Sequence, residues 1–138
     1  MLALAVPIAA WGALVGYSGH VVDQELAEID FDVVRKQGDN KRVRNFELSQ
    51  IEASCGGGPP EPIGGLVIDS MRVNQRNRFK GSTEDDDEPP STMRVTGRIV
   101  NQGKAARGTV RATDIFENSN GEEQLCDSGQ VDWTARRN

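Results

Sequence analysis

The sequence predicts an all-β fold, an antiparallel β-sandwich preceded by an apolar N-terminal leader helix. From Glu28 onward, apolar and polar residues alternate with a period of two, which is typical of strands with one buried and one wet face. Clusters of Gly, Pro, Asn and Asp interrupt this alternation at short intervals, which indicates roughly six or seven strands joined by turns. A barrel is the other arrangement such strands adopt, and immunoglobulin-like topology is one strand order within the sandwich class.

Composition limits the size of the core and the class of partner. The chain has 138 residues, of which 36% are apolar and 5% aromatic, which suits a single domain over residues 19–138. The 21 acids and 16 bases give a net charge of −5 and are mixed along the sequence. No basic stripe of a nucleic-acid binder is visible in this order, so we expect neither DNA nor RNA as a partner. The lone histidine, His20, leaves no His pair for a catalytic dyad or an ordinary zinc site, and we expect no cofactor.

Residues 1–18 are interpreted as a signal peptide or a short membrane anchor. Leu2–Val15 is uncharged and apolar, has the length of a signal-peptide core, and falls short of the roughly 20 apolar residues that span a bilayer. The small residues Gly16 and Ser18 suit cleavage before Gly19. Because the segment lacks a basic start, a retained anchor and an ordinary buried helix are the alternatives. We therefore expect an extracellular or cell-envelope protein that meets a membrane only through an uncleaved leader.

The first strands follow the leader. Ile29–Val33 alternates cleanly, and a turn at residues 37–40 leads to a second strand over Val43–Cys55. The apolar phase of the second strand slips at Ser49–Gln50, which indicates a β-bulge or a bend.

The Gly- and Pro-rich run at residues 56–65 is expected to form a surface loop. A third strand follows over residues 66–73, and Phe79 is expected to be a core residue on a short edge strand. The clearest alternation marks three last strands, at residues 93–99, 110–116 and 131–136, and turn clusters lie at residues 101–104 and 118–121.

Trp133 shares its phase with Val131 and Ala135 on the last of these strands. We expect it to be the largest apolar anchor of the C-terminal sheet and to pack close to the cysteine pair.

Cys55 and Cys126 are the two cysteines of the chain. Two cysteines in an exported protein usually pair, and this bond would close a loop of about 72 residues and contribute roughly 4 kcal/mol in the chain-entropy model. Two buried free thiols, or one thiol bonded to another molecule, are the alternatives. A catalytic cysteine needs a base, and none is in view.

Carboxylates offer two further possibilities. The five consecutive acids at residues 84–88 could ligate Ca²⁺, but calcium loops intersperse their ligands with turn residues, so we expect a solvated loop and no metal site. A carboxylate-dependent hydrolase needs two acids that face each other across a cleft, and no spacing demonstrates one, so no catalytic residue is assigned. The candidate acids for such a pair are Asp30, Asp32, Asp114 and Asp132.

Basic residues on the C-terminal strands suggest a binding face. If the strands are neighbours, four arginines on their polar phase form a cationic patch suited to wall polyanions or acidic polysaccharide. The other interpretation is a solvated face on which Asp132 and Glu117 neutralise the arginines. The four residues are Arg94, Arg98, Arg111 and Arg136.

Short motifs complete the sequence pattern: VTGRI at residues 95–99, GTVR at 108–111, CDSG at 126–129 and WTARR at 133–137, with VRNF at 43–46 ahead of Cys55. Together they resemble uncharacterised exported β-sandwich proteins of high-GC Gram-positive bacteria. The resemblance implies the fold, export and pairing of the two cysteines, and it implies no activity. We expect a non-catalytic secreted or cell-envelope module that binds an envelope polymer or another extracellular protein, with a small extracellular carboxylate-dependent hydrolase as the alternative.

Overall fold

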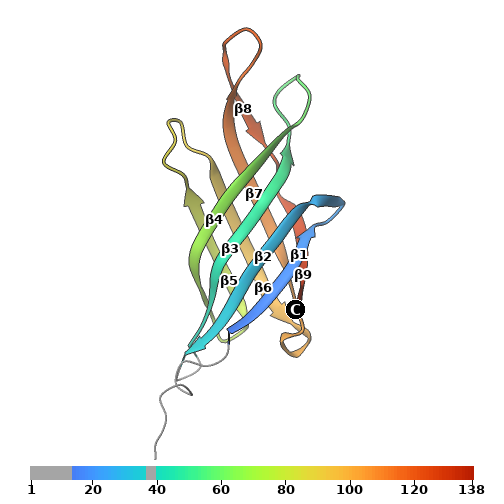
Figure 1. Cartoon of the computed structure of the whole chain (residues 1–138), viewed down its shortest axis with the longest axis vertical. Coiled ribbons are helices and arrows are strands. Elements are labelled where there is room, and N and C mark those ends of the chain that lie inside the picture. The colour runs from blue at the N-terminus through green and yellow to red at the C-terminus, as the bar shows by residue number, and fades with distance from the viewer. Residues whose placement is uncertain (1–13, 37–39) are drawn as a thin grey trace, which may run out of the picture.

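The computed structural model describes residues 14–36 and 40–138, which form nine β-strands and one short 3-10 turn (Figure 1). The strands are β1 (Leu14–Val21), β2 (Gln24–Lys36), β3 (Asn40–Ala53), β4 (Glu61–Val73), β5 (Arg78–Glu84), β6 (Thr92–Val100), β7 (Ala105–Glu117), β8 (Glu123–Asp127) and β9 (Val131–Arg137), with η1 (Asn101–Gly103) between β6 and β7.

The strands form one antiparallel sheet in the order β4-β3-β2-β1-β9-β7-β6-β5, with β8 also paired to β7. β8 and β9 share one edge of β7, since β8 pairs with residues 113–117 and β9 with residues 105–110. β8 and β9 therefore act as one interrupted strand. The strands β1 to β4 and β5 to β9 form two up-and-down meanders, and the pairing of β9 with β1 joins them into one rolled sheet (Figure 1). The all-β antiparallel prediction is confirmed, but the sheet is nearly a barrel and not clearly a sandwich.

The strand that joins the two halves of the sheet, β1, begins within the segment that the sequence pattern assigned to a leader. Most of the expected leader helix lies outside the described residues, but residues 14–18 belong to β1, which pairs with β2 and β9. Without β1, the groups β2-β3-β4 and β5-β6-β7-β9 would be separate sheets, as in the expected sandwich. The boundary expected before Gly19 falls inside this paired strand. No helix in the described ranges has the length and apolar character needed to span a bilayer.

The seam of the barrel lies between β4 and β5, which are consecutive in the chain but are not neighbours in the paired sheet. Side chains cover this seam: a Cβ placed on Gly81 of β5 would lie 2.7 Å from Cγ of Met71 on β4. Phe79 is buried on β5, an edge strand, as expected.

The run at residues 56–65 is a loop only as far as residue 60, because Glu61–Gly65 begin β4. An edge strand tolerates Pro62, which lacks a backbone donor. A Cβ on Gly64 would overlap the carbonyl oxygen of Ser49, so this glycine is needed for the close approach of β4 to β3. The expectation of a loop over the whole run is therefore wrong, because the Gly and Pro residues of its second half are accommodated in the edge strand β4.

The phase slip in β3 is confirmed, since Leu48 and Ile51 on either side of Ser49–Gln50 are both buried. A second slip follows Val43, where Asn45 adopts a left-handed conformation with φ 53°. β8 was not predicted, because only Cys126 of its five residues is buried and no alternation stands out.

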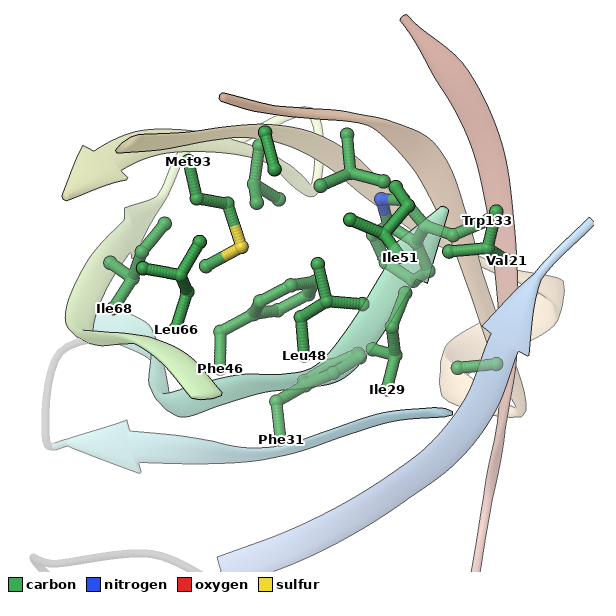
Figure 2. Close-up of a cluster of buried hydrophobic side chains, with 14 of the residues drawn as sticks. Val21, Ile29, Phe31, Phe46, Leu48, Ile51, Leu66, Ile68, Met93 and Trp133 are labelled. Carbon is green, nitrogen blue, oxygen red and sulfur yellow. The ribbon is translucent and has the colours of Figure 1, made fainter. Parts of the chain in front are cut away.

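The barrel interior is filled by side chains (Figure 2). Phe31 stacks on Tyr17 and Phe46 at centroid distances of 5.0 and 5.4 Å, and Trp133 meets Phe46 edge-on at 5.4 Å. A barrel of about eight strands is just wide enough for its interior to be filled by side chains in this way.

Trp133 is fully buried, as predicted, but its expected closeness to the cysteine pair is wrong. Trp133 pairs with Gly108, whereas Cys126 pairs with Asp114, six residues farther along β7. At the rise of a β-strand, this separation is about 20 Å.

Candidate functional site

Cys55 and Cys126 form a disulfide with an S–S distance of 1.96 Å. The bond ties the β3–β4 loop to β8, and paired backbone hydrogen bonds of 3.0 Å between Ser54 and Asp127 flank it. The side-chain amide of Gln124 also donates to the carbonyl oxygen of Cys55. The intramolecular pairing is confirmed, and its place among backbone bonds makes the disulfide structural. Such bonds are typical of oxidising compartments.

Acids and bases that are mixed along the sequence separate along the axis of the barrel. β2 begins near Glu25 and ends near Arg35, whereas β3 begins near Lys41 and ends near Glu52. Because neighbouring strands are antiparallel, these opposite orders place like charges at the same end.

β5 runs from Arg78 to Glu84, and β7 runs from Arg107 to Glu117. These two strands run in the same direction, on either side of β6, so their bases lie at one end and their acids at the other. We call the end that holds the β4–β5 turn (residues 74–77) and η1 the basic end; it is the lower end in Figure 1.

The opposite end holds the three long loops at residues 54–60, 85–91 and 118–122 (Figure 1). There the carboxylate of Asp85 accepts hydrogen bonds from the backbone N–H groups of Asp87 (3.1 Å) and Ser91 (2.9 Å). The bond from Ser91 is the main cause of a lowered pKa at Asp85, and the charge of Asp85 raises the pKa of Asp87. In the part of the chain that the structure describes, no group of three or more His, Cys, Asp or Glu is arranged to hold a metal ion.

A groove of about 1040 Å³ crosses the outer face of the sheet near the basic end and is lined by β4, β5, β6, β7 and β9. We call it the arginine groove. Asp132 is the one acid in its lining, and all of its basic residues are exposed. These basic residues are Arg72, Arg78, Lys80, Arg98 and Arg107.

Three of these arginines form a row across neighbouring strands. Arg78 lies directly opposite Arg98, which in turn lies directly opposite Arg107. Like charges at directly opposed positions, with Cβ atoms about 5 Å apart, destabilise a sheet. Within residues 14–36 and 40–138, none of the three has a carboxylate partner, since the one ion pair there joins Arg111 to Asp127. Three like charges opposed in one row, inside a groove, make this surface a candidate binding site.

Buried contacts fix the strands beneath this row. The indole N–H of Trp133 donates to the carbonyl oxygens of Thr96 (3.1 Å) and Thr109 (3.2 Å), which face each other on β6 and β7. The hydroxyls of the same two threonines lie 2.6 Å apart on the outer side. A Cβ on Gly108 would overlap the carbonyl oxygen of Thr96, so β7 lies tightly against β6. The backbones that carry Arg98 and Arg107 are therefore held in a fixed arrangement.

The four arginines expected to form the binding face are all exposed on the neighbouring strands β6, β7 and β9, as the prediction required. Only Arg98 lines the arginine groove. Arg94 lies opposite Arg111, whose guanidinium makes two hydrogen bonds, of 3.1 and 2.6 Å, to the carboxylate of Asp127. The acid that neutralises Arg111 is therefore Asp127, and not Asp132 or Glu117. Arg136 lies opposite Ala105 on one side and Ser18 on the other.

The sequence pattern missed Arg72, Arg78, Lys80 and Arg107. Arg107 is in phase with Arg111 and would have been found had the strand been extended by three residues toward its start. Arg78 and Lys80 flank the buried Phe79 and so belong to its outward phase. Arg72 could not be placed from the pattern, because its position in the groove depends on how the seam brings β4 next to β5.

The four candidate acids of a hydrolase lie on three strands, β2, β7 and β9. Asp30 and Asp32 share a face of β2, Asp114 lies opposite Cys126, and Asp132 lies opposite Thr109 at the arginine groove. The register places no two of these four acids opposite each other.

No model of a protein family matches the chain, and no curated protein matches it. The resemblance to exported β-sandwich proteins stays a prediction that neither comparison tests.

Proposed function

We propose that this protein is a non-catalytic secreted or cell-envelope module that binds an anionic envelope polymer in the arginine groove. The observation that supports this function is the row of Arg78, Arg98 and Arg107, which lie opposite one another without a carboxylate partner in the described part of the chain. A bound anion would remove the repulsion among them, so relief of repulsion adds to the affinity.

The chemistry of the row fits carboxylate, sulfate or phosphate groups. Guanidinium groups bind such groups with two parallel hydrogen bonds, which gives geometric selectivity as well as charge. The groove has a volume of about 1040 Å³, which leaves space for more than one charged unit of a polymer. Because Trp133 fixes the strands beneath, binding requires no rearrangement of this backbone, and the ordering cost is that of the exposed arginine side chains.

An envelope polymer fits better than a nucleic acid. The Cys55–Cys126 bond is typical of an oxidising, extracytoplasmic compartment. Proteins that bind single-stranded nucleic acid stack bases on exposed aromatic rings, and the exposed large apolar residues of the described ranges are all aliphatic.

Calorimetric titration with oligogalacturonate, a chain of carboxylated sugars, tests this function. In the variant R78Q/R98Q/R107Q, we expect the affinity to fall by about tenfold or more and the salt dependence to weaken by roughly one unit of slope per arginine. The control variant R44Q/R94Q/R136Q removes the same charge at exposed positions outside the groove and should change the affinity by less than about threefold.

Equal losses in the two variants would show that net charge alone drives binding, and no loss in the groove variant would place the site elsewhere. Single-stranded DNA of matched charge is run in parallel. Tighter binding to the DNA than to the sugar polymer would overturn the choice of an envelope polymer.

A further inference from the structure

A second basic hollow adjoins the arginine groove. It has a volume of about 860 Å³ and lies at the basic end, between β2, β3, β4 and the β4–β5 turn. We call it the turn hollow. Its basic residues are Arg35, Lys41, Arg72 and Arg76, and the rest of its lining is Val73 and the amide side chains Asn40, Asn74, Gln75 and Asn77.

The two hollows are neighbours, because Arg72 and Asn74 line both of them. Taken together, their lining contains one acid, Asp132, which lies on β9 in the arginine groove. A path of basic residues therefore runs from β7 and β6 across the seam of the barrel to β3 and β2. In this order its members are Arg107, Arg98, Arg78, Lys80, Arg72, Arg76, Lys41 and Arg35.

The turn between the hollows is well ordered by hydrogen bonds. The side-chain oxygen of Asn74 accepts from the backbone N–H groups of Arg76 (2.8 Å) and Arg78 (3.0 Å), which belong to different hollows. Lys41 donates through Nζ to the side-chain oxygen of Asn77 at 3.1 Å. The carbonyl oxygen of Asn77 accepts from the backbone N–H of Ile99 at 2.8 Å. The turn is thus fastened to β3 and to β6, and the two hollows keep one relative position.

We propose that the ligand is a linear polyanion that occupies both hollows at once and crosses the seam at Arg72. This inference rests on the proposed function and adds the shape of the ligand to it. A compact anion fills one hollow and gains nothing from the other. A chain with a charge on every unit gains the second contact at a high effective concentration, so its affinity rises with length.

The experiment compares galacturonate oligomers of increasing length. For the native sequence, we expect the affinity to rise by about a hundredfold from the dimer to an oligomer that spans both hollows, and then to level off. In R35Q/K41Q/R76Q, the long oligomer should bind no more than a few times better than the dimer, while affinity for the dimer is retained. In R78Q/R98Q/R107Q, both affinities should fall. R44Q/R94Q/R136Q is again the control for the loss of three charges.

Because Lys41 also bonds Asn77, the variant R35Q/R76Q is measured as well, and thermal melts verify that each variant folds. An affinity that does not depend on length, or that stays unchanged for the long oligomer in both turn variants, would overturn the inference and leave the proposed function intact. If the groove variant bound as tightly as the native sequence, the proposed function itself would be overturned. Inorganic polyphosphate of matched length then distinguishes a phosphate polymer from a carboxylate one.

Discussion

Trp133 on β9 packs the edge of its indole ring against Gly97 on β6, where a Cβ would lie 2.8 Å from Cζ2 of the ring. The ring also donates its N–H to carbonyl oxygens on β6 and β7. One side chain of the core therefore links three strands directly beneath the arginine groove. Stability of the barrel and geometry of the groove depend on the same residue.

Replacing Trp133 with alanine should destabilise the protein by about 3–5 kcal/mol, because the change removes a fully buried ring and leaves a cavity. Thermal or urea unfolding followed by circular dichroism measures the loss. Leu125, which is 58% exposed, provides the control, since Leu125→Ala should change stability by less than about 0.5 kcal/mol. Similar effects of the two substitutions would contradict the core role of Trp133.

Gly108→Ala should destabilise the protein strongly, although it adds only one methyl group. The added Cβ would overlap the backbone carbonyl of Thr96, and backbone on a paired strand cannot move away cheaply. We expect a loss of roughly 3 kcal/mol, at the upper end of overpacking effects. A Cβ on Gly57 has no atom within 4 Å, so Gly57→Ala is the matched control and should be nearly neutral. An unfolding midpoint for Gly108→Ala equal to that of the control would show that β6 and β7 are less tightly apposed.

Reduction of the Cys55–Cys126 bond should lower the free energy of unfolding by about 4 kcal/mol, because the unfolded chain regains the freedom of a large loop. For a domain of this size the melting temperature should fall by roughly 10 °C or more. The double variant C55S/C126S should melt like the reduced protein. Two thiols that react with a labelling reagent in unreduced, denatured protein would contradict the bond.

Stability should depend on acid pH through Asp127. Its pKa is lowered, first by the hydrogen bond from Arg111, so folding favours the charged carboxylate. The resulting stability is therefore present above the unfolded pKa of about 3.9 and is lost as the pH falls through the lower folded pKa. Because the pair is partly exposed, the contribution should not exceed about 1 kcal/mol.

The contribution of Asp127 is measured by urea unfolding of the native sequence and of Asp127→Asn between pH 6 and pH 2.5, a range set by the usual carboxyl pKa of about 3.9. The free energies of unfolding of the two proteins should converge as the pH falls. Asp87→Asn is the control of opposite sign. The pKa of Asp87 is raised, chiefly by Asp85, so removing its charge should stabilise the protein at neutral pH. A constant difference between the native protein and Asp127→Asn over the whole range would exclude a contribution from titration.

A chain that begins at Gly19 should be much less stable than one that begins at Leu14. The five residues between them include Tyr17, whose buried ring stacks on Phe31 and whose hydroxyl donates to the carbonyl oxygen of Gly103 at 2.5 Å. They also supply part of the pairing that joins β2 to β9. Melting temperatures of the two truncated proteins measure the effect, and equal values would show that these residues are dispensable.

The sequence by itself determined the local features. The period-two pattern depends only on which side of a strand each residue faces, so it identified most of the strands, the phase slip in β3 and the burial of Trp133. The same pattern identified Arg98 as a surface residue, and the presence of two cysteines in a chain expected to be exported predicted their pairing.

Tertiary structure decided how these pieces meet. Residues 14–18 lie at the end of an apolar stretch and suit the end of a leader, and only the pairing of β1 with β2 and β9 shows that this strand joins the sheet into a near-barrel. Opposed residues on different strands, such as Arg78, Arg98 and Arg107, are set by register, which a one-strand pattern does not contain. The separation of charge has the same physical cause: antiparallel strands reverse the order of acids and bases, so a mixture along the chain becomes two charged ends in space.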